Sequence, residues 1–329
     1  MRSLYKIVFL LTASVLLMRC SREKIVGPEN DFIAPLTPGN LRVFAAFDGQ
    51  VGLEWGKNDE PDLKGYYIYR SINNEDHFER ISLTETNYFT EKSLFYDSTY
   101  YYKISAVNRN DLESPLTSSV FARPVNIYTP LVPRRLEINA RNWTDHLEIR
   151  LTWEPPTDTD IQGYRIYRST SSGFTADSLH YLDFTPGISY SDTKQIKLLT
   201  NYHYKIIAVD KGGLTSDETS EVYDMALNSP RLVFPADKSV INSLREFRFV
   251  TVSDSARYKL VISSNELYGT IMEINFSSGK IDQEIGVSVT GLQLDQFRTY
   301  YWRIYAYTSS EVDPNSYSAL SAFTYYPSN

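Results

Sequence analysis

Few residues in this 329-residue chain have the type and spacing that catalysis or metal binding requires. The four histidines are His77, His146, His180 and His203, and none lies in a His-Glu-x-x-His or similar metal-binding spacing. His203 falls on the outward side of a predicted strand, and the other three lie in polar stretches or turns. We interpret all four as solvated surface residues and expect neither a metal site nor a catalytic histidine.

Two acidic turns are the remaining candidates for a metal ion. Asp59-Glu-Pro-Asp62 and Asp158-Thr-Asp160 could offer carboxylate oxygens to calcium, but neither has the spaced ligands of a calcium-binding loop. Aspartate at such a position also stabilises a turn through its own backbone. No phosphate-binding glycine loop, nucleophile elbow or Arg-Gly-Asp tripeptide occurs in the chain. We therefore predict a protein that is not an enzyme and uses no cofactor.

An alternating seven-residue segment occurs three times and indicates the elements of the fold. The copies are Tyr100-Tyr-Tyr-Lys-Ile-Ser-Ala106, Tyr202-His-Tyr-Lys-Ile-Ile-Ala208 and Tyr300-Tyr-Trp-Arg-Ile-Tyr-Ala306. Positions one, three, five and seven are aromatic, aromatic, Ile and Ala. A period of two places these side chains on one face of a β-strand and the mostly polar remainder on the other.

Companion strands precede the first two copies at a nearly constant spacing. Val51–Trp55 is matched by Leu147–Trp153, and Asp62–Arg70 is matched by Asp160–Arg168, each about 100 residues further on. Short strands with turns between them and no helical periodicity predict antiparallel β-sandwiches. A repeat of this length indicates an array of domains rather than a solenoid.

These motifs together resemble the fibronectin type III domain. The resemblance rests on the strand-two tryptophans, the Gly-Tyr-x-Ile-Tyr strand and the alternating sixth strand. It extends to a Leu-to-Tyr corner and an aromatic-x-acid fifth strand. The residues that carry it are Trp55, Trp153, residues 65–69, residues 163–167, Leu94, Ile196, Leu294, Phe89-Thr-Glu91 and Tyr190-Ser-Asp192.

The third unit departs from this pattern. It has Phe247-Arg-Phe249 where tryptophan is expected, and Ala256–Ile262 replaces the Gly-Tyr strand. We interpret it as a divergent type III or immunoglobulin-like sandwich. The predicted fold is thus all-β, with three tandem antiparallel sandwiches. The predicted boundaries are 1–19 for a signal peptide, 20–35 for a tether, and 36–124, 132–227 and 228–327 for the sandwiches.

The N-terminal segment predicts export and lipid attachment. Arg2 and Lys6 precede an apolar stretch, Ile7–Met18, which is too short to span a bilayer but suits a signal peptide. Leu17-Met-Arg-Cys20 resembles the lipobox of bacterial lipoproteins, in which the cysteine is lipidated, although Arg19 departs from the small residue usual there. Cys20 is the only cysteine, so the sandwiches contain no disulfide.

Net charge restricts the partners. The formal charge of −7 and the pI near 5.3 argue against nucleic acid, whose phosphates require a basic surface. We predict a non-catalytic cell-envelope lipoprotein, anchored to the membrane by its lipid, that acts as a spacer and interaction or adhesion module for an envelope protein. Loops at one end of each sandwich are the predicted contacts: Asn108–Ser114, Asp210–Ser216 and Thr308–Asn315.

A second function from a different class is carbohydrate binding. Tyrosine accounts for 26 residues, and most of them suit core or half-buried strand positions. An outward platform of Tyr67, Tyr69, Tyr101 and Tyr301 would instead serve a surface glycan as an accessory binding protein. The fold alone does not choose between these functions.

Overall fold

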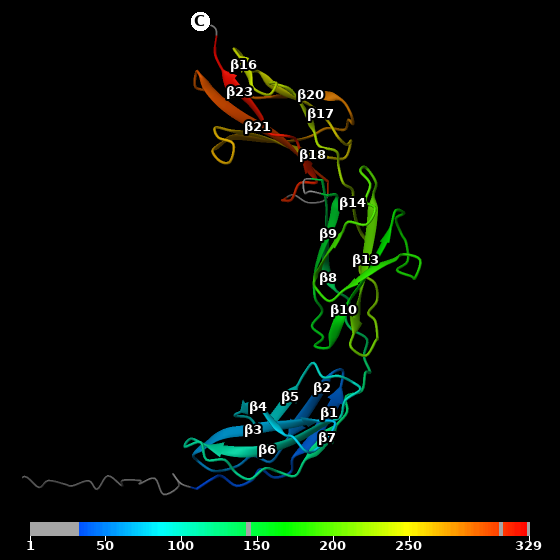
Figure 1. The fold of residues 1–329 in the computed structure, drawn as a ribbon, viewed down its shortest axis with the longest axis vertical. Helices are drawn as coiled ribbons and strands as arrows, with labels where there is room; N and C mark the ends of the chain where they lie inside the picture. Colours follow the sequence, from blue (N-terminus) through cyan, green and yellow to red (C-terminus); the bar gives the residue numbers. More distant parts are fainter. Residues whose placement is uncertain (1–32, 143–145, 309–311, 328–329) are drawn as a thin grey trace, which may run out of the picture.

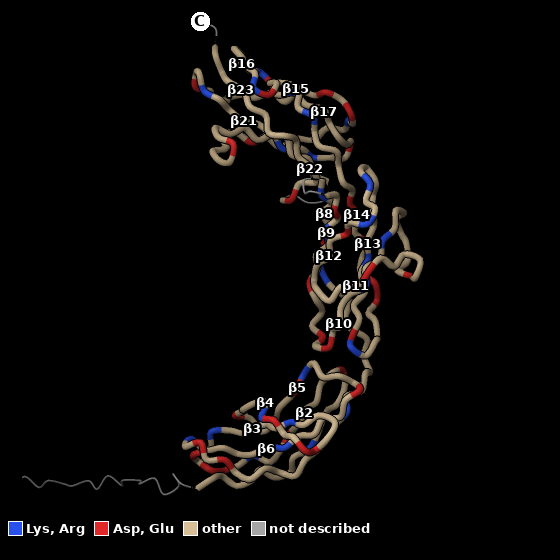
Figure 2. Tube along the Cα trace, in the orientation of Figure 1, with Lys and Arg blue, Asp and Glu red and all other residues tan. Residues whose placement is uncertain are grey.

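The computed structural model describes residues 33–142, 146–308 and 312–327, and its regular elements over these ranges are β-strands. The predicted signal peptide and most of the predicted tether, Cys20 included, lie outside the described residues. Three sandwiches follow one another end to end along a curved rod (Figure 1). Acidic and basic residues are interspersed along its whole length (Figure 2). No helix among the described residues is long and apolar enough to cross a membrane.

The first sandwich consists of a three-stranded and a four-stranded sheet. One sheet has the order β1 (Arg42–Phe47), β2 (Gln50–Glu54) and β5 (Tyr88–Glu91). The other has the order β4 (Glu79–Thr84), β3 (Leu63–Ile72), β6 (Tyr100–Asn108) and β7 (Val120–Ala122). All of these pairings are antiparallel.

The second sandwich repeats this order strand for strand. Its smaller sheet has the order β8 (Arg134–Arg141), β9 (Glu148–Glu154) and β12 (Ser189–Asp192). Its larger sheet has the order β11 (Tyr181–Thr185), β10 (Ile161–Ser169), β13 (Tyr202–Asp210) and β14 (Val222–Asp224). The identical order confirms the predicted all-β sandwich repeat.

The third sandwich differs at its edges. Its smaller sheet has the order β15 (Arg231–Phe234), β17 (Glu246–Val250) and β20 (Glu284–Ser288). The larger sheet has the order β16 (Ser239–Ile241), β23 (Ser321–Tyr325), β21 (Arg298–Tyr307), β18 (Arg257–Ser263) and β19 (Thr270–Ser277), with β22 (Ser316–Tyr317) also paired to β21. The edge pairing of β16 with β23 is parallel, whereas the other strand pairings of this sandwich are antiparallel, as predicted.

Each sandwich has its own hydrophobic core, built from the residues that the alternation predicted. In the first core, Trp55 packs edge-on against Tyr66 with ring centroids 5.3 Å apart, and Trp153 packs against Tyr164 at 5.1 Å in the second. Phe249 takes this place against Tyr258 in the third, at 5.2 Å. An aromatic pair therefore joins the two sheets of every sandwich.

Glycine is required at two kinds of position in the repeat. Asp48 and Gly49, with φ of 46° and 65°, form the tight turn between β1 and β2. Gly163 lies near the start of β10, where an added Cβ would be 2.4 Å from the Phe184 ring and 2.6 Å from the Thr185 carbonyl oxygen. The neighbouring strand β11 therefore approaches too closely for any side chain at this residue.

Candidate functional site: buried triads and the joints between sandwiches

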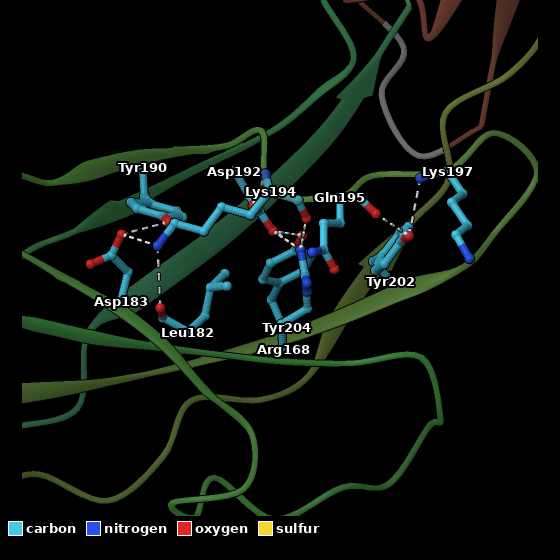
Figure 3. A network of polar contacts seen from close by, with 10 residues as sticks. All are labelled: Arg168, Leu182, Asp183, Tyr190, Asp192, Lys194, Gln195, Lys197, Tyr202 and Tyr204. Carbon is cyan, nitrogen blue, oxygen red and sulfur yellow. Dashed lines mark hydrogen bonds and ion pairs between the residues drawn. The ribbon is translucent and has the colours of Figure 1, made fainter.

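Side chains from three strands form a charged cluster between the two sheets of the second sandwich, shown in Figure 3. Arg168 from β10 donates to Asp192 from β12 at 2.6 Å and to the Lys194 carbonyl at 2.8 Å. The Tyr204 hydroxyl from β13 donates to the same Asp192 oxygen at 2.7 Å. The Asp192 side chain has no exposed area. This triad ties the smaller sheet to the larger one.

The first sandwich contains the same triad. Arg70 from β3 forms a short ion pair with Glu91 from β5, and the Tyr102 hydroxyl donates to the other Glu91 oxygen at 2.7 Å. The aromatic-x-acid strand thus supplies the acceptor in both sandwiches. In the sequence these acids marked only a family motif, and their contact with the arginine was not predicted.

The third sandwich has apolar side chains at the three equivalent positions. Strand register places Ile262 and Trp302 where the first two sandwiches have arginine and tyrosine. Val289 takes the position of the acid in the first two sandwiches, and its N–H donates to the Arg245 carbonyl at 3.1 Å. Since a buried ion pair and a well-packed apolar cluster can be similarly stable, this replacement keeps the two sheets together.

Electrostatics argue for a structural role of the triads. Burial raises the pKa of the Tyr204 phenol, and the negative charge of Asp192 raises it further. The same two causes, burial and then Glu91, raise the pKa of Tyr102. Both phenols therefore remain protonated hydrogen-bond donors at physiological pH.

A tyrosine corner closes each sandwich, as the Leu-to-Tyr spacing predicted. The Tyr100 hydroxyl accepts the Phe95 N–H at 2.9 Å, and the Tyr300 hydroxyl accepts the Asp295 N–H at 2.8 Å. Tyr202 makes the equivalent bond at 3.0 Å. These phenols use their polar ends to fix the loop before the sixth strand.

The acidic turns hold the segment that enters each sandwich. Glu60 accepts the Leu36 N–H at 2.7 Å, and Asp158 accepts the Leu131 N–H at 3.1 Å. Over the described residues, no group of three or more His, Cys, Asp or Glu is placed to hold a metal ion. Glu60 and Asp158 of these turns thus hold the backbone of the entering segments.

The joint between the first and second sandwiches is built from backbone and side-chain hydrogen bonds. Ser93 donates to the Thr159 carbonyl at 2.7 Å, and the Tyr96 hydroxyl makes a short bond to Asp160. Lys211 returns a bond to the Ser93 carbonyl at 2.9 Å. This joint therefore has donors and acceptors from both sandwiches.

The connecting segment is held as well. Asp48, in the β1–β2 turn, accepts the N–H groups of Ile127 and Tyr128 at 2.8 and 3.1 Å. Asn126 then donates to Asp210 of the second sandwich at 3.1 Å. The proline-containing linker is thereby hydrogen-bonded to both sandwiches.

A single buried carboxylate organises the joint between the second and third sandwiches. Asp224, which is 2% exposed, accepts the Ala140 N–H and the Asn315 amide, each at 2.8 Å. Its other oxygen accepts a short bond from the Thr308 hydroxyl. Arg141 adds an ion pair to Asp313 at 2.9 Å. Residues from both sandwiches thus share one acceptor.

These joints use two of the three loops predicted as partner contacts. Asp210–Ser216 faces the first sandwich, and the described residues Thr308, Asp313 and Asn315 of the last loop contact the second, so both loops bind neighbouring sandwiches of the same chain. In the first sandwich, Asn108 of the corresponding loop donates to the Ile33 carbonyl at 3.2 Å. The last residues of the predicted tether therefore lie against this loop.

The predicted tyrosine platform is divided between sandwiches and partly covered. Tyr67, Tyr69 and Tyr101 share one face of the first sandwich, but Tyr301 belongs to the third. The four are half-buried. Arg80 lies over the Tyr67 ring at 4.4 Å, Tyr69 donates to Glu113 at 2.6 Å, and Tyr101 contacts Phe121. The four tyrosines therefore do not form one continuous platform.

One histidine was interpreted incorrectly. His203 is on the outward side of β13 as expected, but it is only 8% exposed. The Tyr223 ring stacks on it with centroids 5.2 Å apart, and its Nδ1 lies 2.8 Å from Glu221. Large side chains from the adjacent strand cover this face, which alternation alone does not reveal.

No protein-family model matches the chain. Among solved structures, the chain is similar to the FN1–FN3 domains of chicken CNTN1, at 14% sequence identity and a TM-score of 0.37, over 89% of this chain and 99% of that one. A likeness this weak carries no functional argument, and the fold stands on the strand pairing given above.

Proposed function

We propose that the protein is a non-catalytic, membrane-anchored lipoprotein of the bacterial cell envelope that acts as a spacer and interaction module. The observation that carries this proposal is the pair of hydrogen-bonded joints. Buried or half-buried groups link neighbouring sandwiches at both joints, so the three sandwiches form one extended body. A spacer needs such joints because flexible linkers would let the array fold back on itself.

The position of the chain ends suits an anchor at one end of the rod. Ile33 lies against the first sandwich, and the C-terminal end of the described chain is at the opposite end of the rod (Figure 1). A lipid on Cys20 would then hold the first sandwich near the membrane and project the third away from it. An envelope protein is the proposed partner.

Metabolic labelling with a clickable palmitate tests the anchor. The wild-type chain is expected to take up the label and to fractionate with membranes, whereas Cys20→Ser is expected to do neither. A double variant, Cys20→Ser with Ser21→Cys, moves the thiol by one residue; it is the matched control and should remain unlabelled. Label on Cys20→Ser equal to that on wild type would refute lipid attachment at this cysteine.

A further inference from the structure

Two buried carboxylates lie side by side in the joint between the first and second sandwiches. Asp160 immediately precedes β10, and Asp210 ends β13, where it pairs with Ile161. The Lys211 N–H donates to the Asp160 carbonyl at 2.8 Å, which holds the two strand ends together. The residues are 4% and 1% exposed. Two ionised carboxylates in such a place repel each other with little screening by water.

The first sandwich has an aspartate and an asparagine at the two equivalent positions. Asp62 and Asn108 are the equivalents of Asp160 and Asp210, and the Arg109 N–H donates to the Asp62 carbonyl in the same way, at 2.9 Å. There the Asn108 amide donates to the Asp62 carboxylate at 3.2 Å. The second sandwich has replaced the donor amide with another acceptor.

The two carboxylate oxygens of Asp210 differ in their hydrogen bonding. Its Oδ1 accepts the N–H groups of Gly212 and Leu214 and the amide of Asn126, at 2.9, 2.8 and 3.1 Å. Its Oδ2 is buried and receives no hydrogen bond from any described protein group. An ionised carboxylate can only accept, so a proton on one of the two acids supplies the donor that is missing.

We propose that Asp160 and Asp210 share one proton and that mild acidification therefore tightens the joint between the first and second sandwiches. With one proton bound, the repulsion between the acids is replaced by a hydrogen bond of the kind that Asn108 makes in the first sandwich. This joint responds to pH whether or not Cys20 carries a lipid.

Further acidic groups face the pair from the first sandwich. Asp48 lies in the β1–β2 turn, next to Gly49, where an added Cβ would be 2.9 Å from the Cβ of Asp160. The Tyr96 hydroxyl donates to Asp160 across the joint. Burial raises the pKa of the Asp160 carboxyl, the charges of Asp210 and Asp48 act in the same direction, and the bond from Tyr96 opposes them.

The nearby basic groups are directed to backbone carbonyls. Lys211 donates from Nζ to the Ser93 carbonyl at 2.9 Å, and its ammonium lies 5.1 Å from the centre of the Phe95 ring. Arg123 donates from Nε to the Tyr96 carbonyl at 3.0 Å. These contacts leave the repulsion between the two acids in place.

The direction of the pH effect follows from linkage. A carboxyl whose pKa is raised on folding binds its proton more tightly in the folded chain than in the unfolded one. The stability that it contributes is fully present below the ordinary carboxyl pKa and is lost as pH rises through the raised value. The joint should therefore be firmer at about pH 5 than at about pH 7.5.

Carboxyl titration by NMR on the full chain, with labelled aspartate, tests the proposal directly. In wild type, the Asp160 carboxyl signal should titrate above the ordinary aspartate range. Amide exchange at Gly212 and Leu214, corrected for intrinsic rate, should be several-fold slower at the lower pH. Asp210→Asn should return Asp160 toward its ordinary range and keep the amides protected at both pH values.

Two further variants make the result decisive. Tyr96→Phe removes the phenol that lowers the pKa of Asp160, so its titration should move further upward. Asp97→Asn changes an exposed acid of the same loop and should behave as wild type. The proposal is overturned if the wild-type Asp160 signal titrates in the ordinary aspartate range, or if Asp210→Asn leaves the Asp160 titration unchanged.

Discussion

Truncation of Asp192 should be costly, because the buried Tyr204 hydroxyl and the half-buried Arg168 guanidinium, both from the opposite sheet, depend on its carboxylate. Arg168 and Tyr204 both donate to it, and neither has another side-chain acceptor among the contacts described above. A buried ion pair is weak evidence of net stability, yet the loss of one partner is costly because the other charge remains buried. The same reasoning applies to Glu91 in the first sandwich.

Asp192→Ala should therefore lower the free energy of unfolding of the second sandwich by about 3–5 kcal/mol. Urea denaturation followed by Trp153 fluorescence measures this change. Asp217→Ala, an exposed acid in the same sandwich, should stay within about 0.5 kcal/mol of wild type. Equal midpoints for the two variants would show that the triad contributes nothing.

Asp224 has the corresponding role at the second joint. Its truncation removes the acceptor of the Ala140 N–H and of the Thr308 hydroxyl, and one of the two acceptors of the Asn315 amide. A hydrogen bond to a charged group contributes about 1.5–3 kcal/mol, so we expect Asp224→Ala to open the joint without unfolding either sandwich. Hydrogen exchange should increase at residues 139–142 and 315–316. Unchanged protection there would contradict this role.

At the scale of elements, the strands could be predicted from the sequence, whereas the contacts at the joints could not. Alternation identified the inward residues Tyr66, Ile68, Tyr102 and Ile104, and all four are fully or almost fully buried in one core. The reason is that each strand repeats the same local rule, with one face towards the partner sheet. Three copies of the motif made the rule visible.

The residues at the joints follow no comparable pattern in the sequence. Tyr96 contacts Asp160 only because the next sandwich lies against it, and its equivalent in the second sandwich is Leu198. Asp224 likewise depends on Thr308, which is far away in the sequence. The parallel pairing at the edge of the third sandwich has no sequence signal either, since the three-residue strand β16 shows too little alternation to reveal direction.

Each sandwich should unfold as an element of its own. Trp55→Ala and Trp153→Ala remove a buried ring from one core each, at a cost on the order of 3–5 kcal/mol. Hydrogen exchange with mass spectrometry should show lost protection in the mutated sandwich and retained protection in the core strands of the other two. Loss of protection along the whole chain in either variant would show that the sandwiches fold as one cooperative unit.

At the scale of the whole molecule, the proposed spacer function depends on length and curvature. Both joints contain buried carboxylates with donors from neighbouring sandwiches, and the resulting body is a curved rod (Figure 1). Compact domains joined by flexible linkers would sample many relative orientations. The joints described here predict one dominant orientation at each junction.

The most direct measurement is a spin-label distance distribution between the first and third sandwiches of the full chain. The labels are attached through Glu85→Cys and Glu266→Cys, at exposed positions of the two outer sandwiches, in a chain that also carries Cys20→Ser. A single narrow distribution at the separation seen in the rod is the predicted result, and Asp224→Ala should broaden it. A broad distribution in the otherwise unmodified chain, unaffected by Asp224→Ala, would contradict the account of a rigid spacer.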